Sequence, residues 1–97
     1  MSYFKLVALN KISIYIPVFN GEKTIKQSIK SIKSQTIKFD EIIVVNDCST
    51  DKTLEILRSI KKIRIINNKK NLGLAASRNI AFKNCKNKCL FLEYQLL

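Results

Sequence analysis

The sequence predicts an α/β domain in which helices alternate with the strands of a parallel sheet. Three observations support this prediction. Residues 42–45 form a run of branched apolar side chains without polar alternation, which is typical of a strand buried on both faces. Polar turn formers follow this run at once, at residues 46–51. Segments with helical spacing separate it from other β-branched runs, and such alternation predicts parallel strands with right-handed crossovers.

The first strand is predicted at residues 11–17, where isoleucines alternate with Ser13 and Tyr15. β-Branched residues dominate this segment, which favours a strand. Pro17 marks its end, because proline cannot donate a hydrogen bond to the sheet ladder. A helix is then predicted at residues 22–35, where isoleucines recur at helical spacing and give one apolar stripe.

The second strand, at residues 41–45, is the buried run around which the chain is organised. A second helix is predicted at about residues 50–61, with leucine and isoleucine along one side and Asp51 in its first turn. Residues 63–67, IRIIN, are predicted to form the third strand, and a polar loop follows them.

The last part of the chain continues this alternation. A helix is predicted at residues 74–84, where alanine side chains allow close packing on the sheet. Residues 88–92, KCLFL, are predicted to form the fourth strand. The element order β-α-β-α-β-α-β is half of a nucleotide-binding α/β fold. Residues 11–97 form the one predicted domain, after an N-terminal extension of residues 1–10.

The composition limits the class of protein. A length of 97 residues allows one domain, and 46% hydrophobic residues argue for a folded chain. Three cysteines favour reduced thiols in the cytosol, and the lack of histidine disfavours a zinc site. The N-terminus is too weakly apolar for a signal peptide, and no run approaches the ~18 apolar residues of a membrane span. We therefore expect a cytoplasmic protein.

The net charge of +11, from 18 basic and 7 acidic residues, suits anionic partners. Nucleotides, nucleic acids and acidic membrane surfaces all meet this condition, and a merely solvated lysine-rich surface is the plain alternative. Nucleic acid is disfavoured, because no recognition motif is present and the lysines are not clustered with aromatic residues. A peripheral contact with the anionic inner membrane is compatible with the charge.

Two polar loops follow the first two strands, PVFNGE at residues 17–22 and VNDCSTD at residues 45–51. Ligands of open α/β sheets bind beyond the carboxyl ends of the strands, where successive loops diverge. Asp47 is the first candidate for a ligand contact, because its carboxylate can accept the imide N–H of uracil or thymine. Phe19 offers a flat face for stacking. Alternatively, Asp47 and Ser49 shape the turn and cap the next helix, and Phe19 packs in the core.

The phosphate-binding signatures of other nucleotide-binding folds are absent. The sequence contains neither GxGxxG nor GxxxxGK[ST], which disfavours dinucleotide binding and P-loop chemistry. Arg78 is a candidate for a diphosphate contact, with a plain surface position as the alternative. Glu22 is expected in the first turn of a helix, where a carboxylate favours the helix dipole even without a ligand.

Three segments carry a resemblance to a known family: IYIPVFNGEKTI, EIIVVNDCSTDKTLEIL and NKKNLGLAASRNIAF, covering roughly residues 11–92. They resemble the motifs P-V-[YF]-N-x-E, V-[DN]-D-G-S-T-D and N-x-G-x-x-x-A-R-N of the family 2 glycosyltransferases, in the same order and at similar spacing. Three ordered motifs are far more specific than a lone glycine pattern. The resemblance implies the N-terminal half of a GT-A fold with a Rossmann-like sheet.

The resemblance also implies a function. Family members transfer a sugar from a nucleotide-sugar donor, usually a UDP-sugar, to an acceptor in glycan or cell-surface polysaccharide synthesis. Carried over by motif, the nucleotide-binding residues are Pro17, Val18, Phe19, Asn20, Glu22, Asp47, Ser49 and Arg78. Residues 17–20 would hold the base, with Phe19 under it, and Asp47 would bind the base imide. Glu22 and Arg78 would support the donor site near the diphosphate.

The chain departs from the family where a D-x-D-type motif is expected after the fourth strand. The family's carboxylates at that motif bind Mn²⁺ or Mg²⁺ on the donor diphosphate. Here Glu93 replaces the first Asp as a weak candidate ligand, and Tyr94 and Gln95 cannot supply the missing charge. The acceptor-binding half and the general base of inverting members are also absent. A bound metal is therefore doubtful, and we expect the isolated chain to be inactive.

The alternative function is a non-catalytic nucleotide- or partner-binding module that keeps the fold without a metal. A truncated or frame-disrupted gene is the expected origin of residues 93–97, which leave the family pattern. A truncated open sheet exposes an edge and apolar surface, which predicts self-association or a complementing second half.

Overall fold

The computed structural model describes residues 11–36, 38–87 and 91–96. Its elements are β1 (Ser13–Val18), α2 (Ile25–Lys33), β2 (Glu41–Asn46), α3 (Thr53–Arg58), β3 (Arg64–Asn67), α4 (Leu74–Asn84) and β4 (Phe91–Glu93). The four strands form one parallel sheet in the order β3-β2-β1-β4. The predicted α/β fold and element order are therefore confirmed. The expected N-terminal extension and residues 88–90 of the predicted fourth strand lie outside the described residues.

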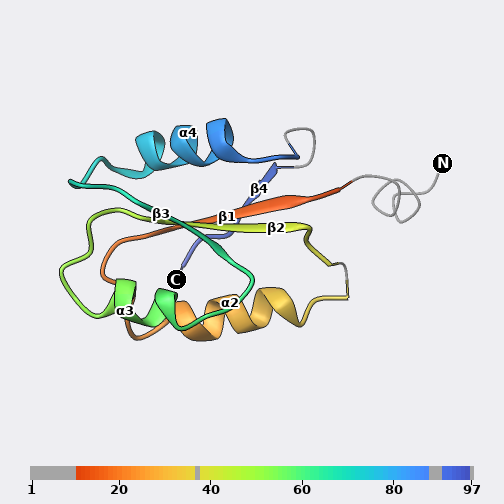
Figure 1. Cartoon of the computed structure of the whole chain (residues 1–97), viewed down its shortest axis with the longest axis horizontal. Coiled ribbons are helices and arrows are strands. Elements are labelled where there is room, and N and C mark those ends of the chain that lie inside the picture. Colours follow the sequence, from red (N-terminus) through yellow and green to blue (C-terminus); the bar gives the residue numbers. More distant parts are fainter. Residues whose placement is uncertain (1–10, 37, 88–90, 97) are drawn as a thin grey trace.

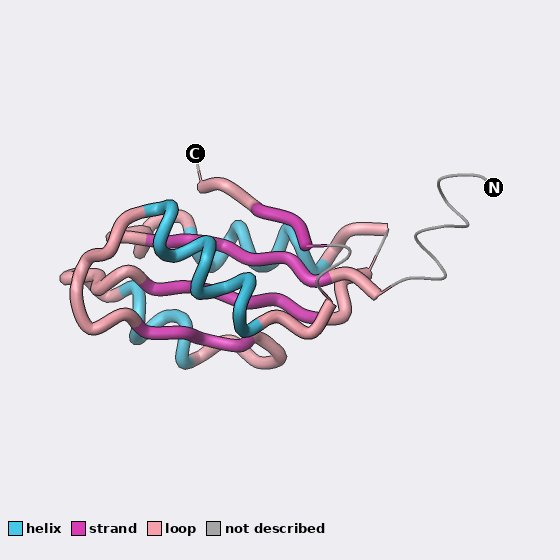
Figure 2. Tube along the Cα trace, turned by 90° about the horizontal axis from the view of Figure 1, so that it is seen from above, coloured by secondary structure: helices cyan, strands magenta, loops and turns pink. Residues whose placement is uncertain are grey.

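Helices cover both faces of the sheet, with α2 and α3 on one face and α4 on the other (Figure 1). Figure 2 shows the strands side by side between these two layers. The core has two parts for this reason. The buried residues on the α2–α3 side are Ile14, Ile16, Val18, Ile25, Ile29, Ile32, Ile42, Val44 and Leu57. Those on the α4 side are Tyr15, Ile43, Val45, Ala81 and Cys85. Neighbouring residues of β1 and β2 thus point to opposite layers, as strand geometry requires.

The central strand β2 confirms the prediction of a strand buried on both faces. Ile43, Val44 and Val45 each have an exposed fraction of 0%. β2 pairs with β1 along its whole length and with β3 on its other side. The run lacks polar alternation because neither of its faces meets water.

β4 is held against β1 by three register pairs and by aromatic packing. The rings of Tyr15 and Phe91 stack with centroids 4.8 Å apart. Phe82 of α4 meets Phe91 edge to face at 5.2 Å. Among the described strands β4 forms one edge of the sheet, and its Leu92 side chain is 47% exposed. Self-association through this edge stays a prediction.

β1 continues through Pro17 to Val18, so the prediction that Pro17 ends the strand is wrong. The backbone carbonyl of Tyr15 accepts a hydrogen bond from the Tyr94 amide at 2.9 Å, so the backbone polar groups of Tyr15 point toward β4. In a strand, residues two apart direct these groups to the same side, so the backbone nitrogen of Pro17 also points toward β4. The described pairing of β1 with β4 ends at Tyr15. The missing N–H of Pro17 therefore costs no hydrogen bond of the described ladder.

Both of the first two helices begin later than predicted. α2 begins at Ile25 and α3 at Thr53, so Glu22 and Asp51 precede these helices and are not in their first turns. The expectation that Glu22 acts through the dipole of its own helix is therefore wrong. Both residues lie in loops whose hydrogen bonds run between loops, as described below. Among the described residues, no helix is both long enough and apolar enough to cross a membrane.

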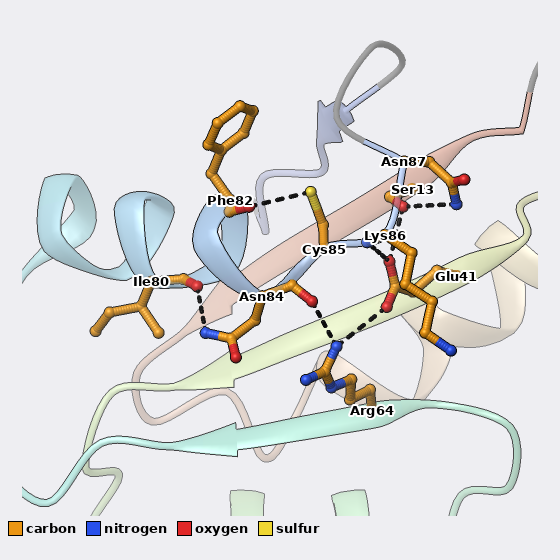
Figure 3. Close-up of polar contacts among 9 residues, drawn as sticks. All are labelled: Ser13, Glu41, Arg64, Ile80, Phe82, Asn84, Cys85, Lys86 and Asn87. Carbon is orange, nitrogen blue, oxygen red and sulfur yellow. Dashed lines mark hydrogen bonds and ion pairs between the residues drawn. The ribbon is translucent and has the colours of Figure 1, made fainter.

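A polar network at the amino end of the sheet ties α4 to the strands (Figure 3). The Glu41 carboxylate accepts hydrogen bonds from the Ser13 hydroxyl at 2.8 Å, the Lys86 amide at 2.9 Å and the Arg64 guanidinium at 3.3 Å. Arg64 also donates to the carbonyl of Asn84 at the end of α4. Burial alone would raise the pKa of Glu41, but the hydrogen bonds from Lys86, Ser13 and Arg64 outweigh it and lower the pKa.

We expect Glu41→Gln to lower the free energy of unfolding by about 2 kcal/mol at neutral pH, because a buried charged acceptor loses its charge-assisted bonds. The folded-state pKa lies below the ordinary value of 4.5, so this stabilisation is present above that pH and is lost as the pH falls through the lowered pKa. Urea unfolding at neutral pH and at about pH 3 measures both effects. Glu55→Gln, an exposed change on α3, is the matched control. Equal losses in both variants would contradict a role for the network.

Candidate functional site

The loops after β1 and β2 lie side by side at the carboxyl edge of the sheet. Val18, the last residue of β1, is in register with Asn46, the last residue of β2. The Asp47 amide donates to the Val18 carbonyl at 2.8 Å and prolongs this pairing by one residue. The predicted juxtaposition of the two polar motifs is therefore present.

The first contact between the two loops is made by Asn20. Its amide donates to the Ser49 hydroxyl oxygen at 2.9 Å, and its side-chain oxygen accepts from the Thr50 amide at 2.8 Å. Asn20 holds a left-handed backbone with φ of 51°, a conformation that asparagine tolerates better than most residues. Asn20 and Ser49, both predicted to bind nucleotide, thus bond to the neighbouring loop.

A second set of contacts completes this interlocking. The Gly21 amide donates to the Thr53 hydroxyl oxygen at 2.9 Å. The Glu22 amide donates to the Asp51 carboxylate, and the Lys52 amide donates back to the Glu22 carboxylate, each at 3.2 Å. Asp51 also accepts from the Thr53 amide at 2.9 Å, which supports the start of α3. Glu22 therefore braces the loops, and this role needs no ligand.

Asp47 is 6% exposed and binds the loop that leads into α4. Its carboxylate accepts hydrogen bonds from the Leu72 amide at 2.7 Å, the Gly73 amide at 2.9 Å and the Asn68 side chain at 2.9 Å. Burial alone would raise the pKa of Asp47, but the bonds from Leu72, Asn68 and Gly73 outweigh it and lower the pKa. Asp47 thus shapes the loop before α4, while Ser49 bonds within its own turn to Asn46. The alternative that these residues cap the next helix is wrong, because α3 has Lys52 at its N-cap and no side-chain cap hydrogen bond. About one of the four acceptor positions of a carboxylate is left, so the base contact stays a prediction.

Three asparagines that the sequence analysis did not select, Asn46, Asn67 and Asn68, extend this arrangement. Asn46, 2% exposed, donates to the Asn67 side chain at 2.7 Å and accepts from the Ser49 hydroxyl at 2.6 Å. Asn68 donates to the Ser77 hydroxyl of α4 at 3.3 Å as well as to Asp47. Asn46 and Asn67 are the last residues of two adjacent parallel strands and lie opposite each other. This position at the strand ends is the signal in the sequence that could have identified them.

An open cleft of about 300 Å³ lies beside the interlocked loops. It is lined by Pro17, Phe19, Leu74, Gln95 and Leu96. The Phe19 side chain is 51% exposed, so the alternative of core packing is wrong for this residue. Leu74, 71% exposed, faces the cleft from the start of α4. The sequence analysis missed Leu74, Gln95 and Leu96, because only the folded chain brings them to Phe19.

Two other predicted residues, Val18 and Arg78, do not line the cleft. Val18 is 2% exposed and packs in the core on the α2–α3 side, so its side chain does not line the cleft. Arg78 is exposed on α4, one helical turn after Leu74. Residues four apart share a face of a helix, so Arg78 lies on the same face of α4 as Leu74, which lines the cleft.

The residues near the end of β4 do not fit a divalent metal. Glu93 lies at the end of this strand, and its carboxylate accepts a hydrogen bond from the Gln95 side chain at 2.6 Å. Within the described ranges, no group of three or more acidic or cysteine side chains could hold a metal ion. Hard divalent cations need several oxygen ligands, and one carboxylate does not supply them. No step of a reaction is therefore assigned to a metal in this chain.

Two larger clefts, of about 400 and 450 Å³, lie at the opposite, amino end of the sheet. Both are lined by Asp40, Ile42 and Lys62. The smaller cleft at the carboxyl edge is nevertheless the better candidate for a nucleotide. Ligands of open α/β sheets bind beyond the carboxyl ends of the strands, and the half-exposed ring of Phe19 lies there.

Comparison with known proteins identifies the family of the chain. Residues 13–92 match the glycosyl transferase family 2 domain. A glycosyltransferase of Haemophilus influenzae is 48% identical over 73 residues, which cover 71% of this chain and 23% of the relative. The UDP-Glc:alpha-D-GlcNAc-diphosphoundecaprenol beta-1,3-glucosyltransferase WfaP of Escherichia coli is 43% identical over 85 residues, which cover 84% of this chain and 34% of the relative. The chain thus spans at most about a third of the length of these relatives.

Solved structures show the same fold. S. aureus TarS 1-349 in complex with UDP has a TM-score of 0.71 at 29% identity, over 88% of this chain and 27% of that one. The mannosyltransferase PcManGT from Pyrobaculum calidifontis, in complex with GDP-Man and Mn²⁺, has a TM-score of 0.72 at 21% identity, over 78% of this chain and 24% of that one. This second likeness concerns the fold alone. From the match over residues 13–92 and these relatives, the chain belongs to glycosyl transferase family 2.

Proposed function

We propose that this chain binds the nucleotide of an activated sugar donor, with UDP as the first choice, and so forms the donor-binding part of a sugar transfer. The observation that carries the proposal is the exposed Phe19 ring, which lines a cleft beside interlocked loops at the carboxyl edge of the sheet. The name of the E. coli relative contains UDP-Glc, and the TarS structure contains UDP. Transfer to an acceptor is proposed for the longer proteins of this kind.

The proposed roles follow from the positions of three side chains. Phe19 stacks under the base, because its ring is half exposed in the cleft. Asp47 accepts the imide N–H with the acceptor position that the loop between β3 and α4 leaves open. Arg78 pairs with the diphosphate, because a guanidinium forms charge-assisted bonds with phosphate oxygens.

A second candidate function is a nucleotide-binding module without transfer activity. The observation that favours it is the Glu93 carboxylate, which bonds to Gln95 where a metal-binding motif is expected. The two functions differ in their need for a metal. In the donor-binding function, Mn²⁺ raises the affinity for UDP once further ligands complete a metal site. In the module without transfer activity, UDP binds equally well with and without Mn²⁺.

We expect Phe19→Ala to weaken UDP binding roughly 5- to 150-fold, because stacking of a base on an aromatic ring is worth about 1–3 kcal/mol. Chemical shifts in a ¹⁵N–¹H spectrum, titrated with UDP, measure the affinity. Leu92→Ala is the matched control, because this apolar side chain is exposed to a similar extent on β4. Unchanged affinity in the Phe19 variant, or no UDP-dependent shifts in the wild type, would overturn the proposal.

The same titration in EDTA and in Mn²⁺ tests whether this chain supplies a metal site by itself. We expect equal affinities, because the described carboxylates provide no metal cluster. A tenfold or greater gain in Mn²⁺ would show a metal site that includes residues outside the described part of the chain.

A further inference from the structure

The exposed side of α2 carries a row of lysines. Lys23 and Lys26, which surround the helix start, and Lys30 and Lys33 further along it are all exposed, and no acidic residue lies in the first turn. At 100° per residue, the helical positions Lys26, Lys30 and Lys33 fall within about 60° of one another around the helix, and Lys23 precedes its first turn. The buried Ile25, Ile29 and Ile32 lie on the other side, against the sheet. The row is therefore a direct consequence of how α2 packs.

α3 and the turn after it extend this row. Arg58, Lys61 and Lys62 are exposed, and the Lys33 ammonium donates to the Lys61 carbonyl, which places the end of α2 beside this turn. We call the set formed by Lys23, Lys26, Lys30, Lys33, Arg58, Lys61 and Lys62 the α2–α3 basic face. Glu55 is the acidic residue of α3. The ion pair found between described residues joins Arg64 and Glu41, so it neutralises no member of this face.

The type of anionic partner follows from what lies elsewhere on the surface. The exposed large apolar side chains are Phe19, Leu72, Leu74, Phe82 and Leu92, and none belongs to α2 or α3. Binding of single-stranded nucleic acid uses aromatic stacking in addition to charge, and this face offers no ring for it among the described residues. Long lysine side chains on an amphipathic helix are instead typical of contact with anionic lipid head groups.

We propose that the α2–α3 basic face docks on an anionic lipid bilayer. In Figure 1, α2 and α3 lie together on one side of the sheet, and the loops of the carboxyl edge lie at its end. Docking through the two helices leaves the Phe19 cleft uncovered, because the cleft is lined by other residues. The inference does not rest on the proposed nucleotide binding, because no member of the basic face lines that cleft.

Flotation with vesicles tests this proposal. The wild type is expected to bind vesicles of phosphatidylcholine mixed with phosphatidylglycerol and not vesicles of phosphatidylcholine alone. Each lysine near an anionic surface contributes roughly fivefold to binding, so a Lys23→Gln, Lys26→Gln and Lys30→Gln triple variant is expected to bind roughly a hundredfold more weakly. Binding is also expected to fall with added salt, since the Debye length shortens from ~10 Å at 0.1 M to ~3 Å at 1 M.

The matched control removes the same charge elsewhere. A Lys69→Gln, Lys70→Gln and Lys83→Gln triple variant changes exposed lysines of the α4 side and its preceding loop. It is expected to bind the anionic vesicles much as the wild type does. An equal loss of vesicle binding in this control would show that binding depends on the net charge of the protein and not on the α2–α3 basic face, and would overturn the proposal. So would absence of vesicle binding, equal binding to phosphatidylcholine, or tighter binding of a DNA or RNA oligonucleotide that the first variant abolishes.

Two measurements keep the result interpretable. Circular dichroism of both triple variants should match that of the wild type, because all six lysines are exposed. UDP binding, if present, should be unchanged in the Lys23, Lys26 and Lys30 variant. Failure of the membrane proposal would then leave the nucleotide proposal unaffected, and the reverse also holds.

Discussion

Replacing Asp47 with alanine is expected to lower the free energy of unfolding by roughly 3 kcal/mol, because three donors lose a charged acceptor at once. Those donors are the Leu72 amide, the Gly73 amide and the Asn68 side chain. They belong to the loop between β3 and α4, so the loss should be concentrated there. Urea unfolding measures the total effect, and hydrogen exchange at Leu72 and Gly73 measures the local one.

The control for this prediction is Asp40→Ala. Asp40 is exposed, and its carboxylate accepts one hydrogen bond from the Ile12 amide at 2.7 Å. A single bond of this kind contributes about 1 kcal/mol. If Asp47→Ala cost no more than Asp40→Ala, the Asp47 carboxylate would not be the residue that holds the loop.

The pH dependence of this loop has a definite sign. The pKa of Asp47 is lowered in the folded state from the ordinary value of 3.8. Its stabilising effect is therefore present above about pH 4 and is lost as the pH falls through the lowered pKa. The protection factors of the Leu72 and Gly73 amides, which correct for the intrinsic pH dependence of exchange, should fall in acid in the wild type and change little further in Asp47→Ala. An equal acid dependence in both proteins would contradict the assignment.

The Asp47 result also determines which variant can test nucleotide binding. Loss of UDP binding in Asp47→Ala would have two causes that the experiment cannot separate, namely a lost base contact and a displaced loop. Phe19 makes a cleaner test, because its side chain is half exposed and lines the cleft without holding a loop.

Ile43→Ala is expected to lower the free energy of unfolding by about 2–5 kcal/mol, because it leaves a cavity at the centre of the sheet. Ile43 has an exposed fraction of 0% and packs on the α4 side with Tyr15, Val45 and Ala81. Urea unfolding again provides the measurement. Leu92→Ala, at a position that is 47% exposed, should cost well under half as much. Similar costs in the two variants would mean that β2 is not the centre of the core.

The order of helices and strands could be predicted because it depends on local patterns. The apolar run at residues 42–45 and the isoleucine spacing of α2 specify which faces must avoid water. In a parallel sheet the carboxyl ends of all strands lie at one edge. The prediction that the loops after the first two strands meet at this edge, with Phe19, Asn20, Asp47 and Ser49, is therefore confirmed.

The tertiary structure decided the partner of each polar side chain. Glu22 and Asp51 lie before their helices, because each accepts hydrogen bonds across the two loops. Asp47 binds the loop at residues 68–73, which is more than twenty residues away in the sequence. Such partners depend on which loops the sheet brings together, and spacing within a single motif does not contain that information.

By itself, the sequence determined the α/β order, the two-sided burial of β2 and the edge at which the motifs gather, because hydrophobic periodicity acts within one element at a time. Only the tertiary structure decided that Val18 lies in the core, that Phe19 is exposed, and that Gln95 and Leu96 line its cleft. The physical reason is that burial and hydrogen bonding at a loop are set by segments distant in sequence, which meet only when the sheet has formed.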